Sequence, residues 1–231
     1  LHYYLKELPS GPCDGVIVCH LDNDPETVAI LEETQKVVPL VLLTATPDRK
    51  QFNNVVIDVF GGEKKATEYL IRLGKKRIAF ASGPDSTANR EKLKGYKAGL
   101  KAFDMDVNND YIVHGPSNNF LCGYYAMQKF MELPELPDSI VCATDDIAIG
   151  CLKQCRTNGI RVPEDIAIIG FNGIELLDTY RPSISSVYQP MKDVADALVE
   201  LLMDNINNGG ERKQTRIFHC DLIARESTSS K

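Results

Sequence analysis

The sequence predicts an α/β protein with a doubly wound, parallel sheet, because short apolar runs alternate with segments whose apolar residues recur at helical spacing. The chain shows this pattern best over residues 140–170. Residues 140–143 are an apolar run of strand length, residues 147–155 repeat apolar side chains at helical spacing, and residues 166–170 are a second apolar run. A short strand–helix–strand connection implies a right-handed crossover and parallel pairing.

Similar runs and stop signals predict the other elements. Gly74, Asn158-Gly159 and Gly209-Gly210 each follow a helical pattern, and glycine adopts the left-handed conformation that ends a helix. A helix is also expected at the start of the chain, over residues 3–8. The expected strands span residues 16–19, 40–43, 55–58, 77–81, 111–114, 140–143, 166–170 and 184–188, with a closing segment at 215–223, and the other expected helices span residues 27–37, 61–73, 89–103, 121–133, 145–157 and 191–206.

The composition is that of an ordinary soluble protein, with 231 residues, 25% charged and 43% hydrophobic. A net charge of −6 argues against nucleic-acid binding by this segment alone, because a DNA footprint needs clustered Lys and Arg. No apolar run approaches membrane-spanning length and no signal-peptide pattern opens the chain. We therefore expect a cytoplasmic location.

The seven cysteines are odd in number and scattered, and several lie in apolar strand or helix contexts. This pattern predicts buried thiols in a reducing compartment and no disulfide framework. Cys-x-x-Cys is absent and the four histidines lie far apart, so we expect no metal site and no cofactor.

Polar side chains follow two of the predicted strands, where an open parallel sheet binds its ligands. Asp145 follows residues 140–143, and it is either the N-cap of the next helix or a ligand contact. Asn172 follows residues 166–170, and its amide could read a pair of ligand hydroxyl groups. A purely structural turn at Asn172-Gly173 is the alternative.

Three longer motifs in this region resemble the effector-binding core of the LacI/GalR family of bacterial transcription repressors, and through it the periplasmic sugar-binding proteins. Residues 143–150 read ATDDIAIG, residues 159–172 read GIRVPEDIAIIGFN, and residues 182–190 read PSISSVYQP. The family usually has Asp at the position of Asn172 and Asn at that of Thr144. The resemblance covers nearly the whole chain, with further matches at residues 13–18, 69–79, 95–100 and 222–227.

The resemblance implies a type I periplasmic binding protein-like fold, made of two Rossmann-like subdomains with parallel sheets. The N-terminal subdomain would comprise residues 1–58 and 189–214, and the C-terminal one residues 59–188 and 215–231. The crossings near Asp58, Gln189 and Thr215 would then form a hinge. By the same resemblance, the chain is expected to be N-terminally incomplete, without the first strand–helix–strand unit and without the helix-turn-helix headpiece.

The resemblance also implies ligand-binding residues at the strand ends that face the cleft. Lys92 stands where the family has an arginine that reaches the ligand, and Arg90 lies two residues before it. Because these two side chains point about 200° apart around a helix, only one is expected to face the cleft, unless Arg90 precedes the helix. The candidate ligand-binding residues are Asn172, Lys92, Arg90, Ser86, Ala88, Asn118, Thr144, Asp145, Thr44, Ala45 and Gln189.

The function implied is that of a ligand-sensing core of a repressor, which binds a small molecule, a sugar or sugar-like metabolite, between two lobes. Operator DNA would be bound through the missing headpiece, and a homodimer would form through Tyr180 and residues 145–157. A solute-binding protein of a sugar transporter and a headpiece of another class remain alternatives. An α/β enzyme is disfavoured, because Gly-x-Ser-x-Gly, Gly-x-Gly-x-x-Gly, the phosphate-loop pattern and His-Glu-x-x-His are absent.

Overall fold

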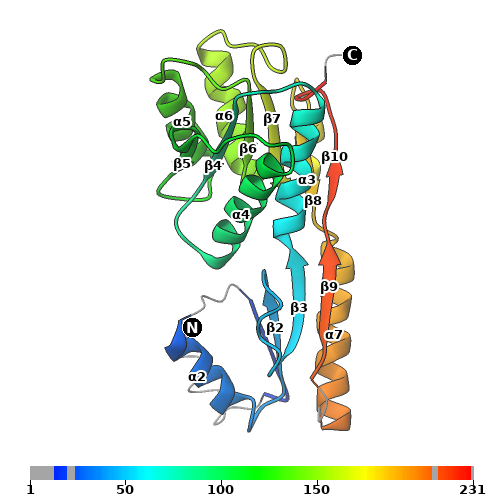
Figure 1. Cartoon of the computed structure of the whole chain (residues 1–231). Coiled ribbons are helices and arrows are strands. Elements are labelled where there is room, and N and C mark those ends of the chain that lie inside the picture. Colours follow the sequence, from blue (N-terminus) through cyan, green and yellow to red (C-terminus); the bar gives the residue numbers. More distant parts are fainter. Residues whose placement is uncertain (1–12, 20–23, 210–212, 230–231) are drawn as a thin grey trace. The chain divides into compact units, whose positions relative to one another are not determined.

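The computed structural model describes residues 13–19, 24–209 and 213–229, and the chain divides into two compact units (Figure 1). Unit 1 comprises Leu1–Asp58 and Pro190–His219, and unit 2 comprises Val59–Gln189 and Cys220–Lys231. The chain therefore passes from one unit to the other three times, after Asp58, after Gln189 and after His219. The helix expected over residues 3–8 and the stop signal at Gly210 lie outside the described residues.

Unit 1 contains a parallel sheet whose strand order is β1-β2-β3-β9. Its strands and helices are β1 (Val16–Val18), α2 (Pro25–Thr34), β2 (Leu40–Thr44), β3 (Asn53–Asp58), α7 (Met191–Asn208) and β9 (Thr215–His219). Helix α2 begins where the Asp24 carboxylate accepts a hydrogen bond from the Thr27 amide at 2.8 Å.

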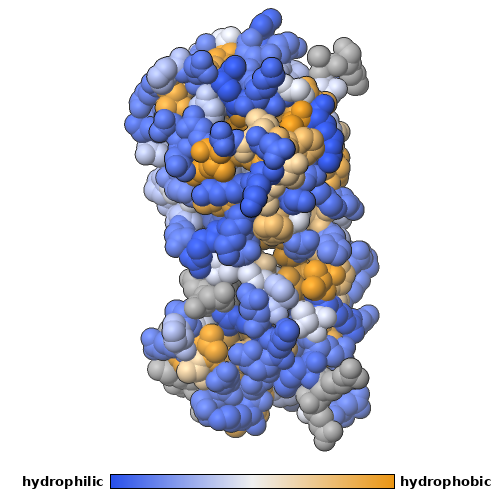
Figure 2. Space-filling view, in the orientation of Figure 1, coloured by the Kyte–Doolittle hydropathy of each residue, from blue (hydrophilic) through white to orange (hydrophobic). Residues whose placement is uncertain are grey.

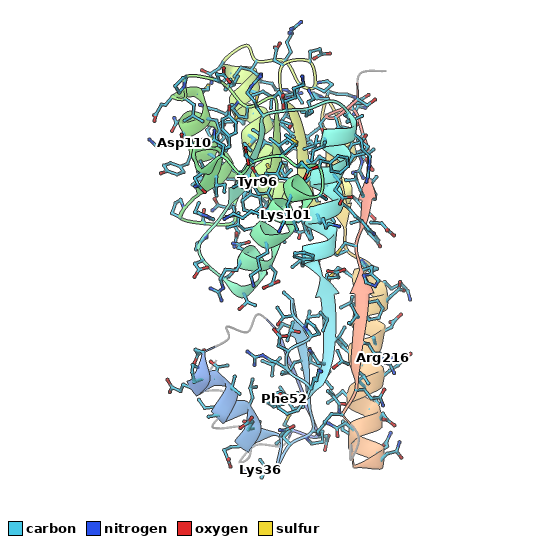
Figure 3. All side chains as sticks on the ribbon, viewed as in Figure 1. Lys36, Phe52, Tyr96, Lys101, Asp110 and Arg216 are labelled. Atoms are coloured by element: carbon cyan, nitrogen blue, oxygen red, sulfur yellow. The ribbon has the colours of Figure 1, made fainter. Side chains whose placement is uncertain are left out.

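The core of unit 1 forms where α2 covers the sheet. Leu31 of α2 packs with Leu40 and Leu42 of β2 and with Phe52, which is labelled in Figure 3. Helix α7 packs against β2 and β3, and Arg216 of β9 forms an ion pair with Glu200 of α7 at 2.7 Å. Leu40 and Leu42 can both pack against Leu31 because alternate residues of a strand lie on the same face of the sheet.

The segment over residues 215–223 divides between the two units. A third crossing near Thr215 is predicted wrongly, because β9 pairs in parallel with β3, with Thr215 beside Asn54 and His219 beside Asp58. The crossing instead follows His219. After Cys220 the chain forms β10 (Asp221–Ile223), which pairs in the antiparallel direction with β8 (Ser185–Tyr188) of unit 2. One expected segment is therefore two strands in two sheets.

Unit 2 contains a sheet with the strand order β10-β8-β7-β6-β4-β5, in which every neighbouring pair except β10–β8 is parallel. The α/β fold class with parallel sheets is thereby confirmed. The remaining elements of this unit are α3 (Val59–Arg72), β4 (Ile78–Ser82), α4 (Thr87–Lys101), η2 (Asn109–Tyr111), β5 (Ile112–His114), α5 (Phe120–Met131), β6 (Ser139–Cys142), α6 (Asp145–Thr157), β7 (Ala167–Asn172) and η3 (Glu175–Thr179).

Two pairs of helices cover the sheet of unit 2. Helices α3 and α4 pack together, and Tyr96 of α4 (Figure 3) stacks on Phe80 of β4 with ring centroids 5.3 Å apart. Helices α5 and α6 also pack together, in a second cluster that contains Ala79 and Ala81. Since Ala79 and Ala81 alternate with Phe80 along β4, the two helix pairs lie on opposite faces. The strands are therefore buried on both sides, as parallel strands usually are.

The surface is mostly polar. On the face shown in Figure 2, hydrophilic residues predominate and the hydrophobic ones form small, separate patches. None of the described helices is both long enough and apolar enough to span a bilayer.

Candidate functional site

The candidate site lies at the carboxyl edge of the unit 2 sheet, where helices α4, α5 and α6 begin. Each of these helices has a polar N-cap. Ser86 accepts a hydrogen bond from the Asn89 amide at 3.2 Å, Asn119 from the Leu121 amide at 3.0 Å, and Thr144 from the Ile147 amide at 3.3 Å. This edge of the sheet therefore carries three helix N-termini whose first turns are held by side-chain oxygens.

Asn118 joins the loops at this edge. The Asn89 side-chain amide donates to Asn118 Oδ1 at 3.1 Å, and the Thr144 hydroxyl donates to the Asn118 carbonyl at 3.0 Å. Gly83 allows the close approach, since a Cβ there would lie 2.2 Å from Asn118 Oδ1. Three segments far apart in the sequence are thus bonded into one rim. The predicted residues Asn118, Thr144 and Ser86 come together here, while Asn89 was not among the predicted residues.

Asn172 ends β7 at the same edge and bonds to Gln189. Gln189 Nε2 donates to Asn172 Oδ1 at 2.8 Å, and the Gln189 backbone amide donates to the Asn172 carbonyl at 3.4 Å. Asn172 is exposed and has a φ of 123°, an unusual backbone conformation that asparagine tolerates better than most residues. One bond between two amides uses one donor and one acceptor, so this amide couple keeps an NH₂ group and a carbonyl oxygen with which to bind a ligand.

Asp145 has a structural role inside unit 2. The prediction that it is the N-cap of α6 is wrong, because Thr144 occupies that position. The Asp145 carboxylate is buried, and it accepts hydrogen bonds from the Ser186 hydroxyl at 2.6 Å and from the Ile174 amide at 2.9 Å. Burial raises the pKa of Asp145, and these hydrogen bonds oppose that rise. Asp145 therefore ties the start of α6 to β8 and to the turn after β7.

Lys92 is also buried. Its Nζ donates to the Ala143 carbonyl at 2.5 Å and lies 3.8 Å from the centroid of the Phe171 ring. Burial lowers the pKa of Lys92 to about 8, and the nearby Glu63 carboxyl opposes that fall. The ammonium group is thus held within unit 2, with only 5% of the residue exposed.

Arg90 lies on the outside of the same helix. It forms an ion pair with Asp85 at 2.7 Å and donates to the Thr87 hydroxyl at 3.1 Å. Because α4 begins at Thr87, Arg90 lies within its first turn and does not precede the helix. Ala88, in the same turn, is half-buried. The opposite placements of Arg90 and Lys92 agree with their angular separation around the helix.

Glu63 is another residue of this region that the sequence analysis did not single out. It lies on α3, fully buried, and among the described residues neither carboxylate oxygen has a hydrogen-bond partner. Burial raises its pKa to about 8, and the Lys92 charge opposes the rise. The sequence does contain a signal for the burial of Glu63. Ala66 and Leu70 follow it at i+3 and i+7, which places all three residues on the buried face of the helix.

The predicted residues of unit 1 are engaged in their own turn. The Thr44 hydroxyl donates at the end of β2, where the Thr46 carbonyl lies at 2.8 Å and Asn54 Oδ1 at 3.0 Å, and Ala45 beside it is half-buried. A pair not anticipated from the sequence joins the last residues of β3 and β9, since His219 Nδ1 lies 2.9 Å from Asp58 Oδ2. Within the described part of the chain, no group of three or more His, Cys, Asp or Glu is arranged to hold a metal ion.

Comparisons with known proteins agree with this architecture. Residues 67–228 match the family model described as "periplasmic binding protein-like domain". Among curated proteins, the HTH-type transcriptional repressor PurR of Vibrio atlanticus (strain LGP32) is 29% identical over 98% of this chain and 68% of its own. The HTH-type transcriptional repressor CytR of Escherichia coli (strain K12) is 31% identical over 87% of this chain and 59% of its own. The chain therefore spans about two thirds or less of the length of these repressors, which are not enzymes.

Solved structures give the same result. The complex of the transcriptional regulator CelR with cellobiose superposes with a TM-score of 0.88 at 29% identity, over 98% of this chain and 69% of that one. A putative transcriptional regulator LacI from Bacillus cereus subsp. cytotoxis NVH 391-98 superposes with a TM-score of 0.90 at 26% identity, over 99% of this chain and 80% of that one. This chain belongs to the periplasmic binding protein-like domain family, in the form of the ligand-binding core of LacI/GalR-type transcriptional repressors.

Proposed function

We propose that this chain senses a sugar or sugar-like metabolite for a DNA-binding repressor. The effector would bind at the carboxyl edge of the unit 2 sheet. Differential affinity for two arrangements of the units would shift the population toward one of them, and the longer protein would transmit this shift to its DNA-binding part.

The observation that carries the proposal is the neutral, polar rim of unit 2. Asn118, Thr144, Asn172 and Gln189 offer amide and hydroxyl groups, which donate and accept hydrogen bonds without a net charge. The Lys92 ammonium is turned inward, and Arg90 is paired with Asp85. Such a rim suits a ligand rich in hydroxyl groups, and the related CelR structure is a complex with cellobiose.

The test is a thermal-shift screen with cellobiose, other neutral sugars, sugar phosphates and nucleobases, since a ligand that binds the folded state stabilises it by mass action. A neutral sugar is expected to raise the melting temperature. Asn172→Ala should then weaken its binding by about 1–3 kcal/mol in calorimetry, because a buried hydrogen bond is lost.

Asn208→Ala is the matched control, because Asn208 is an exposed asparagine at the end of α7 whose side chain donates to Asp204 on the same helix at 2.7 Å. It should leave the affinity unchanged. Stabilisation by a nucleobase or a sugar phosphate but by no neutral sugar would contradict the proposed effector class. Unchanged affinity in Asn172→Ala, with the fold intact, would contradict the proposed site.

The proposal includes a homodimer formed through unit 2. Helix α6 and the half-buried Tyr180 would lie at the interface. Leu176 of η3 supports this surface, because 52% of this leucine is exposed. Lys153 of α6 lies over Tyr124 of α5 at 5.8 Å, so the surface would continue onto α5, where Phe120 and Leu121 are also exposed. Contiguous exposed apolar residues commonly mark a protein–protein interface.

Operator DNA would be bound by the longer protein and not by this segment, in the cytoplasm, where a regulator meets the chromosome. The segment has a net charge of −6, whereas affinity for DNA depends on neutralising phosphates with Lys and Arg. A mobility-shift assay on the gene's own promoter should show retardation by the longer protein only, and a stabilising sugar should change it. Specific retardation by the isolated segment would contradict this division of labour.

A further inference from the structure

A group of ionisable side chains lies inside unit 2, directly beneath the candidate site. Glu63 comes from α3 and Lys92 from α4, and both are buried. Asp145, the first residue of α6, is close enough to Lys92 to influence its pKa. Charged groups are costly to bury, so their presence at this place needs an explanation.

The Lys92 side chain bonds to the backbone of the β6–α6 turn. Its Nζ donates to the Ala143 carbonyl at 2.5 Å, and the Ala143 amide donates to the Ala81 carbonyl of β4 at 2.8 Å. Ala143 is the residue between the end of β6 and the N-cap of α6, Thr144. The charged hydrogen bond therefore fastens the β6–α6 turn from the inside. On the outer side of the same turn, the Thr144 hydroxyl bonds to Asn118 of the rim.

Glu63 has no role of its own in hydrogen bonding among the described residues, yet it lies close enough to Lys92 for each to influence the other's pKa. A nearby carboxylate favours the charged form of a buried lysine, and a nearby ammonium group favours the charged form of a buried carboxyl group. Glu63 and Lys92 therefore each oppose the pKa shift that burial causes in the other.

We propose that Lys92 is a positioning residue for the candidate site. From the interior it holds the Ala143 carbonyl, and it thereby fixes the β6–α6 turn that presents Thr144 to Asn118. The meaning of this role for ligand binding rests on the proposed function. The positioning itself concerns unit 2 alone and can be tested without any ligand.

The attachment depends on pH. Lys92 is faced by Glu63 from α3, by Asp145 from α6 and by Cys220 from the segment before β10, and Glu63 is also near Cys142 of β6. Since the pKa of Lys92 is lowered to about 8, the ammonium form predominates below that pH. As the pH rises through this value, a charged donor becomes a neutral one and its hydrogen bond weakens. The turn is therefore held most firmly below pH 8.

The experiment is amide hydrogen exchange on the 231-residue chain, followed at the Ala143 and Ile147 amides and corrected for intrinsic exchange. Lys92→Met should speed exchange at these amides by about tenfold or more. Lys94→Met is the matched control, because Lys94 lies on the same helix and pairs at the surface with Glu91 at 2.6 Å. Lys92→Arg, which keeps the charge, should restore part of the protection.

The pH profile separates positioning from general stability. Protection of the turn in the wild type should fall between about pH 6.5 and about pH 9.5, and Lys92→Met should show no such step. Glu63→Gln should move the step to lower pH, because the Glu63 carboxylate favours the charged form of Lys92. If Lys92→Met fails to fold, the double variant Lys92→Met/Glu63→Leu removes the buried pair together and is expected to fold. Its turn should still be unprotected and insensitive to pH.

Equal protection of the turn in Lys92→Met and Lys94→Met would overturn the proposal, and so would a loss spread evenly over unit 2 with no pH step. These outcomes do not depend on the sugar screen. If the protein binds no sugar but its turn still loses protection with rising pH, the proposed function is contradicted and the positioning role of Lys92 is not.

Discussion

Glu63 and Asp145 are both buried carboxyl groups of unit 2, but their surroundings differ. Asp145 accepts hydrogen bonds from a hydroxyl and a backbone amide, which stabilise its charged form. Glu63 has no such donors among the described residues, so its pKa rises to about 8 and the neutral form predominates at neutral pH. Burial raises the pKa of both carboxyl groups, but hydrogen-bond donors oppose the rise at Asp145, whereas at Glu63 the charge of Lys92 opposes it.

Glu63→Gln should change the pH dependence of stability. With a folded-state pKa of about 8 against an ordinary 4.5, the folded protein keeps a proton that the unfolded chain releases. The wild type therefore loses stability as pH rises from 4.5 to about 8, and the variant does not. Urea unfolding across this range should show a difference that grows to a few kcal/mol, on the order expected from such a shift, and then levels off.

Glu132→Gln is the control for this series, because Glu132 is exposed and pairs with Lys129 at the surface at 2.9 Å. Its stability difference from the wild type should stay small and constant. A Glu63→Gln difference that is equally flat would mean that Glu63 is ionised in the folded state at neutral pH.

At the scale of an element, α6 shows how a helix end builds the site. Thr144 is the N-cap, and its hydroxyl both accepts from the Ile147 amide and donates to the Asn118 carbonyl. The helix ends at Thr157 with Asn158 as its C-cap, followed by Gly159 with a φ of 70°, which confirms the predicted stop signal. The start of α6 is therefore fixed by a side chain that belongs to the rim, while its end is fixed by the local chain alone.

Thr144→Ala should destabilise the protein by about 0.5–2 kcal/mol, because the first turn of α6 loses its cap. It should also speed hydrogen exchange in the β5–α5 loop, because the Asn118 carbonyl loses its hydrogen bond from Thr144. Thr157→Ala is the control, because Thr157 is exposed on the last turn of the same helix and its hydroxyl donates to the Lys153 carbonyl at 3.0 Å. Chemical unfolding and hydrogen exchange check both effects. If the two variants lose the same stability and the same protection, the Thr144 cap does not stabilise the helix.

At the scale of the whole molecule, each unit has its own sheet and core, and three crossings join them, after Asp58, Gln189 and His219. Two of the residues that precede a crossing, Asp58 and His219, are register partners in adjacent strands and bond to each other. The third, Gln189, bonds to Asn172 of the candidate site. The proposed ligand contact Asn172 is therefore bonded to a residue that precedes a crossing.

Leu176→Asp should weaken self-association, because it places a charge in the proposed apolar interface of unit 2. Val199→Asp is the control, since Val199 lies on α7 of unit 1 and is 54% exposed against 52% for Leu176. In sedimentation at micromolar concentration, Leu176→Asp should raise the dissociation constant by about tenfold or more, and Val199→Asp should not. If the longer, wild-type protein sediments as a monomer at micromolar concentration, the proposed dimer is contradicted.

The α/β class, the order of the elements and the glycines that end α3, α6 and α7 were predictable from the sequence, because helical and strand periodicity and glycine stop signals are local. The carboxyl edge of the unit 2 sheet was predictable too, since parallel strands bring their ends to one side. Asn118, Thr144, Asn172 and Gln189 lie at this edge for that reason.

The roles of Asp145, Lys92 and Glu63 were decided only by the tertiary structure. Thr144 is the N-cap of α6, and the Asp145 carboxylate instead accepts a hydrogen bond from the hydroxyl of Ser186, a residue 41 positions away in the chain. Helical spacing predicts that Lys92 and Arg90 point apart, but not that the lysine is the buried one. Likewise, the split of residues 215–223 between two sheets depends on the partners β3 and β8. The residues that surround these positions lie far from them in the sequence, so local periodicity does not identify them.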